Sequence, residues 1–108
     1  MDSRIRHSIQ FMEQNLSSKL TEKALAHRAC LTAQHFCVLF KIETGETAIP
    51  CLNRLRMEKA RELLECDDHW RLSIKEVAAY LGCRDVSHFV RDFEKRFGQS
   101  PKRYRAGR

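Results

Sequence analysis

The sequence lacks the features that are typical of membrane, secreted or disordered proteins. No apolar run approaches the roughly 20 residues that a membrane-spanning helix needs, and no basic-then-apolar leader opens the chain. We therefore expect no membrane partner and a cytoplasmic location. The 108 residues are 43% hydrophobic and 31% charged, a composition that favours a folded domain over disorder.

The residue groups that carry catalysis or hold metals are missing as well. No Ser/His/Asp or Cys/His arrangement, no Gly-rich phosphate loop and no pair of carboxylates suited to a cleft is present. The five cysteines form no C-x-x-C motif, and their gaps give no metal-ligand spacing with the histidines. We expect reduced structural thiols, no metal, no cofactor and no enzyme activity.

Positive charge is concentrated in the last quarter of the chain. The formal net charge is +6 at pH 7. Residues 1–82 carry 12 basic and 11 acidic side chains, whereas residues 83–108 carry eight and three. A local excess of this kind favours a polyanionic partner, with nucleic acid ahead of an anionic membrane.

The chain also repeats itself at a shift of 52 to 53 residues. KLTEKALA at 19–26 matches RLSIKEVA at 71–78 in the kind of residue at each place. Two phenylalanines and a glycine recur further on: Phe36, Phe40 and Gly45 correspond to Phe89, Phe93 and Gly98. Each copy predicts a helix, a tight turn and a second helix.

Natural N-cap residues mark where these helices begin, because their side chains accept from unpaired amides of the first turn. The expected caps are Thr21 and Thr32 in the first copy, and Ser73 and Asp85 in the second. Ser73 with Glu76 makes a capping box. After the first helix the second copy has Gly82, which suits a positive φ, and the first copy has Cys30. We expect Cys30 to strain or reshape its turn.

Three further helices complete an all-α fold of about seven helices. Residues 3–15 have an apolar face, residues 48–65 form a long linker helix with Pro50 in its first turn, and PKRYRA follows the cap Ser100. CDDHW forms the loop before the second repeat, with Trp70 covering it. The expected organisation is an N-terminal helix plus first helix-turn-helix at 1–46, the linker at 47–66, and the second helix-turn-helix plus C-terminal helix at 67–108.

The second helix of a helix-turn-helix unit is the one that enters the DNA major groove, where base pairs can be distinguished. Phe89 and Phe93 would anchor this helix in the second copy. Arg91 can make a bidentate contact to guanine, and valines can pack on thymine methyls. The candidate base-reading residues are Val86, Ser87, Val90 and Arg91, with Gln34 and Val38 in the first copy. The candidate phosphate contacts are Lys41, Lys95, Arg96, Lys102, Arg103 and Arg105.

The segments FCVLFKIETG, LNRLRMEKARELL, LSIKEVAAYLGC and DVSHFVRDFEKRFGQSPKRYR resemble the DNA-binding domain of AraC/XylS-type bacterial transcription regulators. The resemblance covers residues 3–106. It implies that two reading helices enter successive major grooves on one face of double-stranded DNA. It is also consistent with a transcription activator that contacts RNA polymerase and binds no effector in this domain, either as a stand-alone regulator or as part of a longer chain. The specific C-terminal motif is matched at Ile74, Val77, Ala78, Gly82, Asp85, Ser87, Phe89, Arg91, Phe93, Gly98, Pro101, Tyr104 and Arg105.

The first reading helix departs from the family, which usually has a long polar side chain where this chain exposes Gln34, Cys37 and Val38. Either this apolar face contacts thymine methyls, or the first unit supports the second and contacts only the DNA backbone. In the second copy we expect His88 to pack in place of the usual tyrosine rather than to contact phosphate. We expect Glu94 to pair with Arg91 or Lys95.

The exposed Val38 and Cys37 also allow a different class of function, a helical protein–protein adaptor with weak or non-specific DNA binding. Such a module would show little salt-dependent affinity for DNA. The clustered charge and the paired repeats favour sequence-specific double-stranded DNA binding in transcription regulation.

Overall fold

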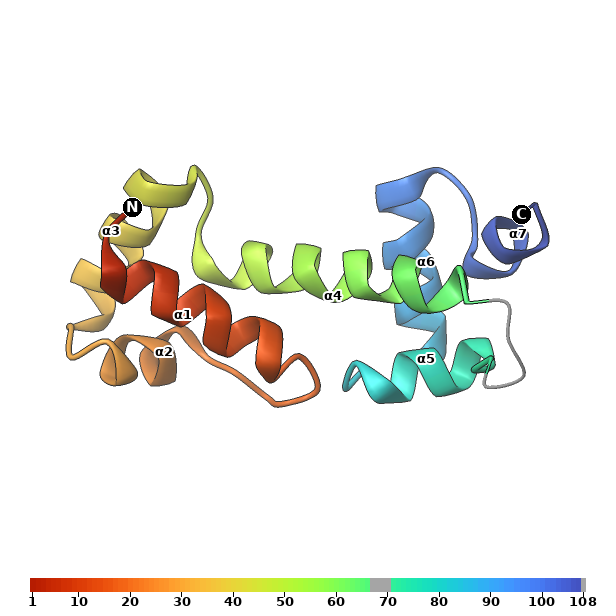
Figure 1. The fold of residues 1–108 in the computed structure, drawn as a ribbon, viewed down its shortest axis with the longest axis horizontal. Coiled ribbons are helices and arrows are strands. Elements are labelled where there is room, and N and C mark those ends of the chain that lie inside the picture. The colour runs from red at the N-terminus through yellow and green to blue at the C-terminus, as the bar shows by residue number, and fades with distance from the viewer. Residues whose placement is uncertain (67–70, 108) are drawn as a thin grey trace. The chain divides into compact units, whose positions relative to one another are not determined.

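The computed structural model of this chain describes residues 1–66 and 71–107, and every regular element within these ranges is an α-helix (Figure 1). The predicted all-α fold with about seven helices is confirmed. The loop predicted around Trp70 lies outside the described residues. No described helix has the length and apolar character needed to cross a bilayer. The helices are α1 (Ser3–Gln14), α2 (Glu22–Arg28), α3 (Ala33–Thr44), α4 (Ala48–Leu64), α5 (Ile74–Tyr80), α6 (Val86–Phe97) and α7 (Pro101–Ala106).

The chain divides into two compact units, Met1–Leu55 and Arg56–Arg108. The division falls inside α4, so the helix predicted as a separate linker contributes its first part to unit 1 and its second part to unit 2. Each unit holds one helix-turn-helix pair, α2 with α3 and α5 with α6, and the members of each pair pack against one another (Figure 1).

Unit 1 is built around two phenylalanines of α3. Phe36 and Phe40 are fully buried, with ring centroids 5.6 Å apart, and α1 and α2 both pack against α3. Burying a side chain of this size contributes about 1.5–3 kcal/mol, so these rings fix which face of α3 points inward. The surrounding buried residues are Ile5, Met12, Leu25, Ala26, Ala48, Cys51 and Leu52.

Unit 2 repeats this plan with Phe89 and Phe93, which are fully buried with ring centroids 6.2 Å apart. Phe93 also contacts Tyr104 of α7 edge-to-face at 5.8 Å, which holds the terminal helix against α6. The phenylalanines that correspond in the sequence therefore also occupy equivalent buried places in the two units. Among the described residues of unit 2, the others that are buried are Met57, Ala60, Leu64, Val77, Ala78, Leu81 and Pro101.

The predicted helix starts are confirmed by hydrogen bonds. The side chains of Thr21, Thr32, Ser73, Asp85 and Ser100 each accept from a backbone amide of the following turn. Ser73 and Glu76 form the full capping box.

The turns between paired helices have the same left-handed conformation and equivalent backbone hydrogen bonds, so Cys30 does not reshape the turn of unit 1. Gly82 has φ +78°, and Cys30, at the corresponding place in unit 1, has φ +59°. Cys30 is the one non-glycine residue with positive φ in the described ranges. A left-handed conformation brings Cβ close to the following carbonyl, so the turn of unit 1 carries strain that Gly82 avoids.

Candidate nucleic-acid interface

The outer face of α6 presents the side chains predicted to read bases. The carboxylate of Asp85 accepts from the backbone amides of Ser87 and His88 and fixes the start of the helix. With Phe89 and Phe93 buried on the inner side, Ser87 and Arg91 are exposed. Val86 and Val90 lie at the half-buried edge of the same face. One helix face thus combines a hydroxyl, a guanidinium and two apolar groups.

Two expectations for this helix are wrong. His88 does not pack: its side chain is 64% exposed, and its Nδ1 lies 3.7 Å from the carboxylate of Asp92. The buried side of α6 is already filled by Phe89, the next residue, so His88 turns outward toward its neighbour one turn on. Within the described residues no ion pair joins Glu94 to Arg91 or Lys95; Glu94 is an exposed carboxylate.

The outer face of α3 is different in character. The hydroxyl of Thr32 accepts from the amide of His35 at 3.1 Å and starts the helix. Gln34, Val38 and Ile42 are exposed, and they follow one another at one-turn intervals. Sequence reasoning missed Ile42, although its position four residues after Val38 was the signal that would have found it.

Cys37 is not part of this exposed row. It is half-buried, and its thiol donates a hydrogen bond to the carboxylate of Glu22 in α2. This hydrogen bond raises the pKa of the Cys37 thiol because it favours the protonated form, and burial and the negative charge of Glu22 act in the same direction. Cys37 therefore ties α3 to α2 as a neutral thiol.

Most of the basic side chains predicted to contact phosphates are available at the surface. The exposed ones are Lys41 in α3, Lys95 and Arg96 at the end of α6, and Lys102 and Arg103 in α7.

Arg105 is the exception among them. Its guanidinium donates to the backbone carbonyls of Leu63, Leu64 and Leu72 within unit 2. We therefore assign Arg105 to the packing of α7 rather than to DNA. Two of these carbonyls belong to the last turn of α4, where backbone acceptors have no partner within the helix.

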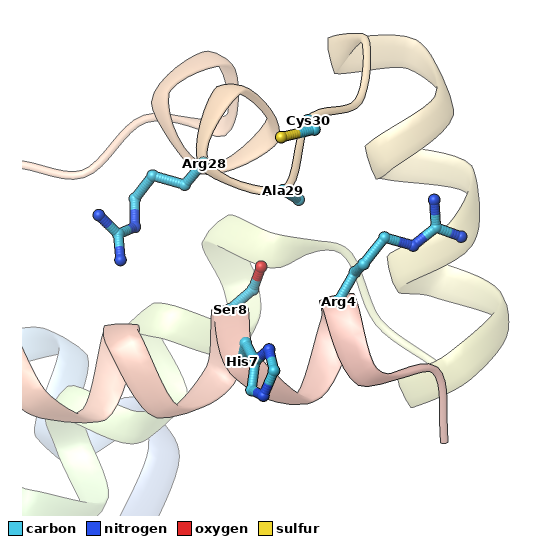
Figure 2. Close-up of a pocket in the computed structure, with 6 residues that line it drawn as sticks. All are labelled: Arg4, His7, Ser8, Arg28, Ala29 and Cys30. Atoms are coloured by element: carbon cyan, nitrogen blue, oxygen red, sulfur yellow. The ribbon is translucent and has the colours of Figure 1, made fainter.

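A pocket of about 350 Å³ opens in unit 1 between α1 and the turn that follows α2. In Figure 2, Arg4, His7 and Ser8 come from α1, and Arg28, Ala29 and Cys30 line the opposite side. Both guanidiniums have partners inside the unit. A guanidinium nitrogen of Arg4 lies 3.0 Å from the carboxylate of Asp2, and the guanidinium carbon of Arg28 lies 3.6 Å from the centre of the Phe11 ring. None of the predicted DNA contacts lines this pocket.

Comparison with known proteins identifies the family. A family model described as a helix-turn-helix domain matches residues 25–107. The C-terminal domain of AraT, a response regulator from Geobacillus stearothermophilus, is 31% identical with a TM-score of 0.87, covering 97% of this chain and 85% of that one. The chain belongs to the AraC-type helix-turn-helix domain family. The resemblance in the sequence is thereby confirmed.

Other members of the family are named as transcription regulators. The transcriptional activator RhaS of Escherichia fergusonii is 36% identical over 107 residues, which are 99% of this chain and 37% of the relative. RhaS of Salmonella schwarzengrund is 33% identical over the same shares. The chain thus spans about 37% of the length of these relatives. The DNA-binding domain of AdpA, a global transcriptional factor solved in complex with a target DNA, has a TM-score of 0.87 at 28% identity, covering 95% of this chain and 90% of that one.

Proposed function

We propose that this AraC-type domain binds double-stranded DNA at specific sequences, with α3 and α6 entering successive major grooves, and thereby regulates transcription. The observation that carries the proposal is the pair of helix-turn-helix units whose second helices are anchored by buried phenylalanines and capped at their starts. This anchoring leaves the opposite face of each second helix exposed, where its side chains can contact base edges. The AdpA domain, similar in fold, is solved on its target DNA.

The proposed roles follow from exposure and side-chain chemistry. In α6, Arg91 contacts guanine O6 and N7, Ser87 hydrogen-bonds a base edge, and Val86 and Val90 supply apolar contact. In α3, Gln34 and Val38 are the base-reading residues. The exposed cations contact phosphates, which sets the position of the domain on the duplex without reading sequence; they are Lys41, Lys95, Arg96, Lys102 and Arg103.

The names of the relatives extend the proposal to the whole regulator. RhaS is named as a transcriptional activator. We propose that the present chain likewise serves activation rather than catalysis and contacts RNA polymerase when bound beside a promoter. An effector would then bind outside this domain, which uses its second helices for DNA.

Selection of bound sites from random duplexes, followed by sequencing, tests the proposal. The expected product is a site with two half-elements about one helical turn apart, because each reading helix meets the groove on the same side of the DNA. Affinity for the selected duplex falls steeply with salt, as expected when phosphate contacts release counterions. Failure to enrich any sequence would contradict the proposal.

A helical adaptor that binds protein is the second candidate, and the exposed Val38 and Ile42 favour it, at 54% and 73% accessibility. A gel-shift titration separates the two functions. An adaptor would bind all duplexes weakly and with little dependence on salt, whereas the proposed reader binds its selected duplex far more tightly than a scrambled one.

A further inference from the structure

The two reading helices carry different chemistry at the same positions. Val38 lies six residues after the N-cap Thr32, and Arg91 lies six residues after the N-cap Asp85. Four residues further on, α3 has Ile42 where α6 has Lys95. Both helices are anchored by an equivalent pair of buried phenylalanines, so matching positions project from matching faces.

Val38 and Ile42 of α3 lie outside the hydrophobic core of unit 1. Val38 is 54% exposed and Ile42 is 73% exposed, although Phe36 and Phe40 on the other side of the helix are fully buried. In the alternative left open by the sequence, this face of α3 contacts only the DNA backbone. That alternative fits poorly with its chemistry, because valine and isoleucine offer no donor to a phosphate oxygen.

We infer that α3 reads A·T base pairs, with Val38 packing on the 5-methyl group of a thymine and Gln34 hydrogen-bonding an adjacent adenine. This inference rests on the proposed function and names the bases that the first unit takes. The thymine methyl is the apolar group that the major groove displays, and a glutamine amide matches adenine N6 and N7.

The same reasoning makes the binding site asymmetric in composition. Arg91 directs α6 to guanine, whose N7 and O6 accept two parallel hydrogen bonds from one edge of a guanidinium. Val38 at the equivalent place directs α3 to thymine. One half-element is therefore A·T-rich at its centre, and the other contains a guanine.

The experiment replaces thymidine by 2′-deoxyuridine, one position at a time, in the half-element read by α3 of the selected duplex. That half-element is the one whose selected bases stay unchanged in Arg91→Ala protein. The replacement removes only the 5-methyl group. At the thymine that Val38 contacts, the replacement should weaken binding about fourfold, because one methyl group is no longer buried in the complex.

Protein variants show whether the methyl is read by Val38. Val38→Ala should bind the thymidine duplex about as weakly as the unchanged protein binds the deoxyuridine duplex, with no further loss on the latter. Tyr80→Ala is the matched control, because Tyr80 is a similarly exposed apolar residue, at 56%, on α5. This variant should show the same loss of affinity on the deoxyuridine duplex as the unchanged protein. Val38→Arg should change the selected base at this position from thymine to guanine.

Two failures can be told apart. If no sequence is enriched, the proposed function fails with the inference. If a specific site is selected but its α3 half-element lacks A·T pairs, or deoxyuridine binds equally well, the inference alone is overturned. Equal deoxyuridine sensitivity in Val38→Ala protein overturns it too.

Discussion

The guanidinium of Arg105 in α7 donates a hydrogen bond to the backbone carbonyl of Leu72, the residue just before the N-cap of α5. It also reaches the carbonyls of Leu63 and Leu64, at 3.5 and 3.4 Å, at the end of α4. One side chain thus joins three parts of unit 2. Leu63 and Leu64 lie in the last turn of α4, where the backbone carbonyls carry partial negative charge that favours a nearby cation.

Replacing Arg105 should therefore affect stability more than DNA contacts. We expect Arg105→Ala to lower the free energy of unfolding by about 2 kcal/mol, the range for hydrogen bonds made by a charged group. Arg103→Ala, on the exposed side of the same helix, should change it by less than about 0.5 kcal/mol and should weaken DNA binding instead. Urea denaturation and a gel-shift titration of both variants provide the measurement. Equal stability losses in the two variants would contradict this assignment.

Arg105 illustrates what the sequence could and could not predict. Helix positions, N-caps and the buried phenylalanines follow from local spacing, and all of these agree with the structure. The partners of Arg105 are 33 to 42 residues away in the chain, so no local pattern separates it from Arg103. His88 is different: its place beside the buried Phe89 and its neighbour Asp92 at i+4 are local signals that already indicate an outward side chain.

The turn of unit 1 offers a stabilising substitution. Cys30 is exposed and has φ +59°, where Gly82 serves in unit 2 with φ +78°. We expect Cys30→Gly to raise the free energy of unfolding by about 1 kcal/mol, because glycine has no Cβ to crowd the next carbonyl. The reciprocal change Gly82→Cys should lower it by a similar amount. Thermal and urea unfolding of both variants check the pair, and a loss of stability in Cys30→Gly would refute the strain at this turn.

The capping box of α5 makes a pH-dependent contribution. The backbone amide and the hydroxyl of Ser73 hold the pKa of Glu76 below its ordinary value of 4.5. A carboxylate whose pKa is lowered in the folded state stabilises the fold above the ordinary pKa, and this stabilisation is lost as the pH falls through the lowered pKa. Unfolding measured from neutral pH down past 4.5 should show a shallower acid loss in Glu76→Gln than in the unchanged protein. Superimposable profiles would show that Glu76 does not contribute.

Arg91 and Lys102 should separate base reading from phosphate contact. Both are exposed cations of unit 2, so each variant loses one positive charge. Arg91→Ala should lose discrimination at one or two base pairs of the selected site, at about 1–3 kcal/mol, and bind non-specific duplex nearly as before.

Lys102→Ala should weaken binding to all sequences alike and reduce the dependence of log affinity on log salt by about one unit, since one fewer counterion is released. Competition binding against a set of single-base variants, repeated at several salt concentrations, measures both quantities. A uniform loss over all sequences in Arg91→Ala would move this residue from the base edges to the backbone. The specificity of unit 2 would then have to reside in Ser87 and the two valines beside it.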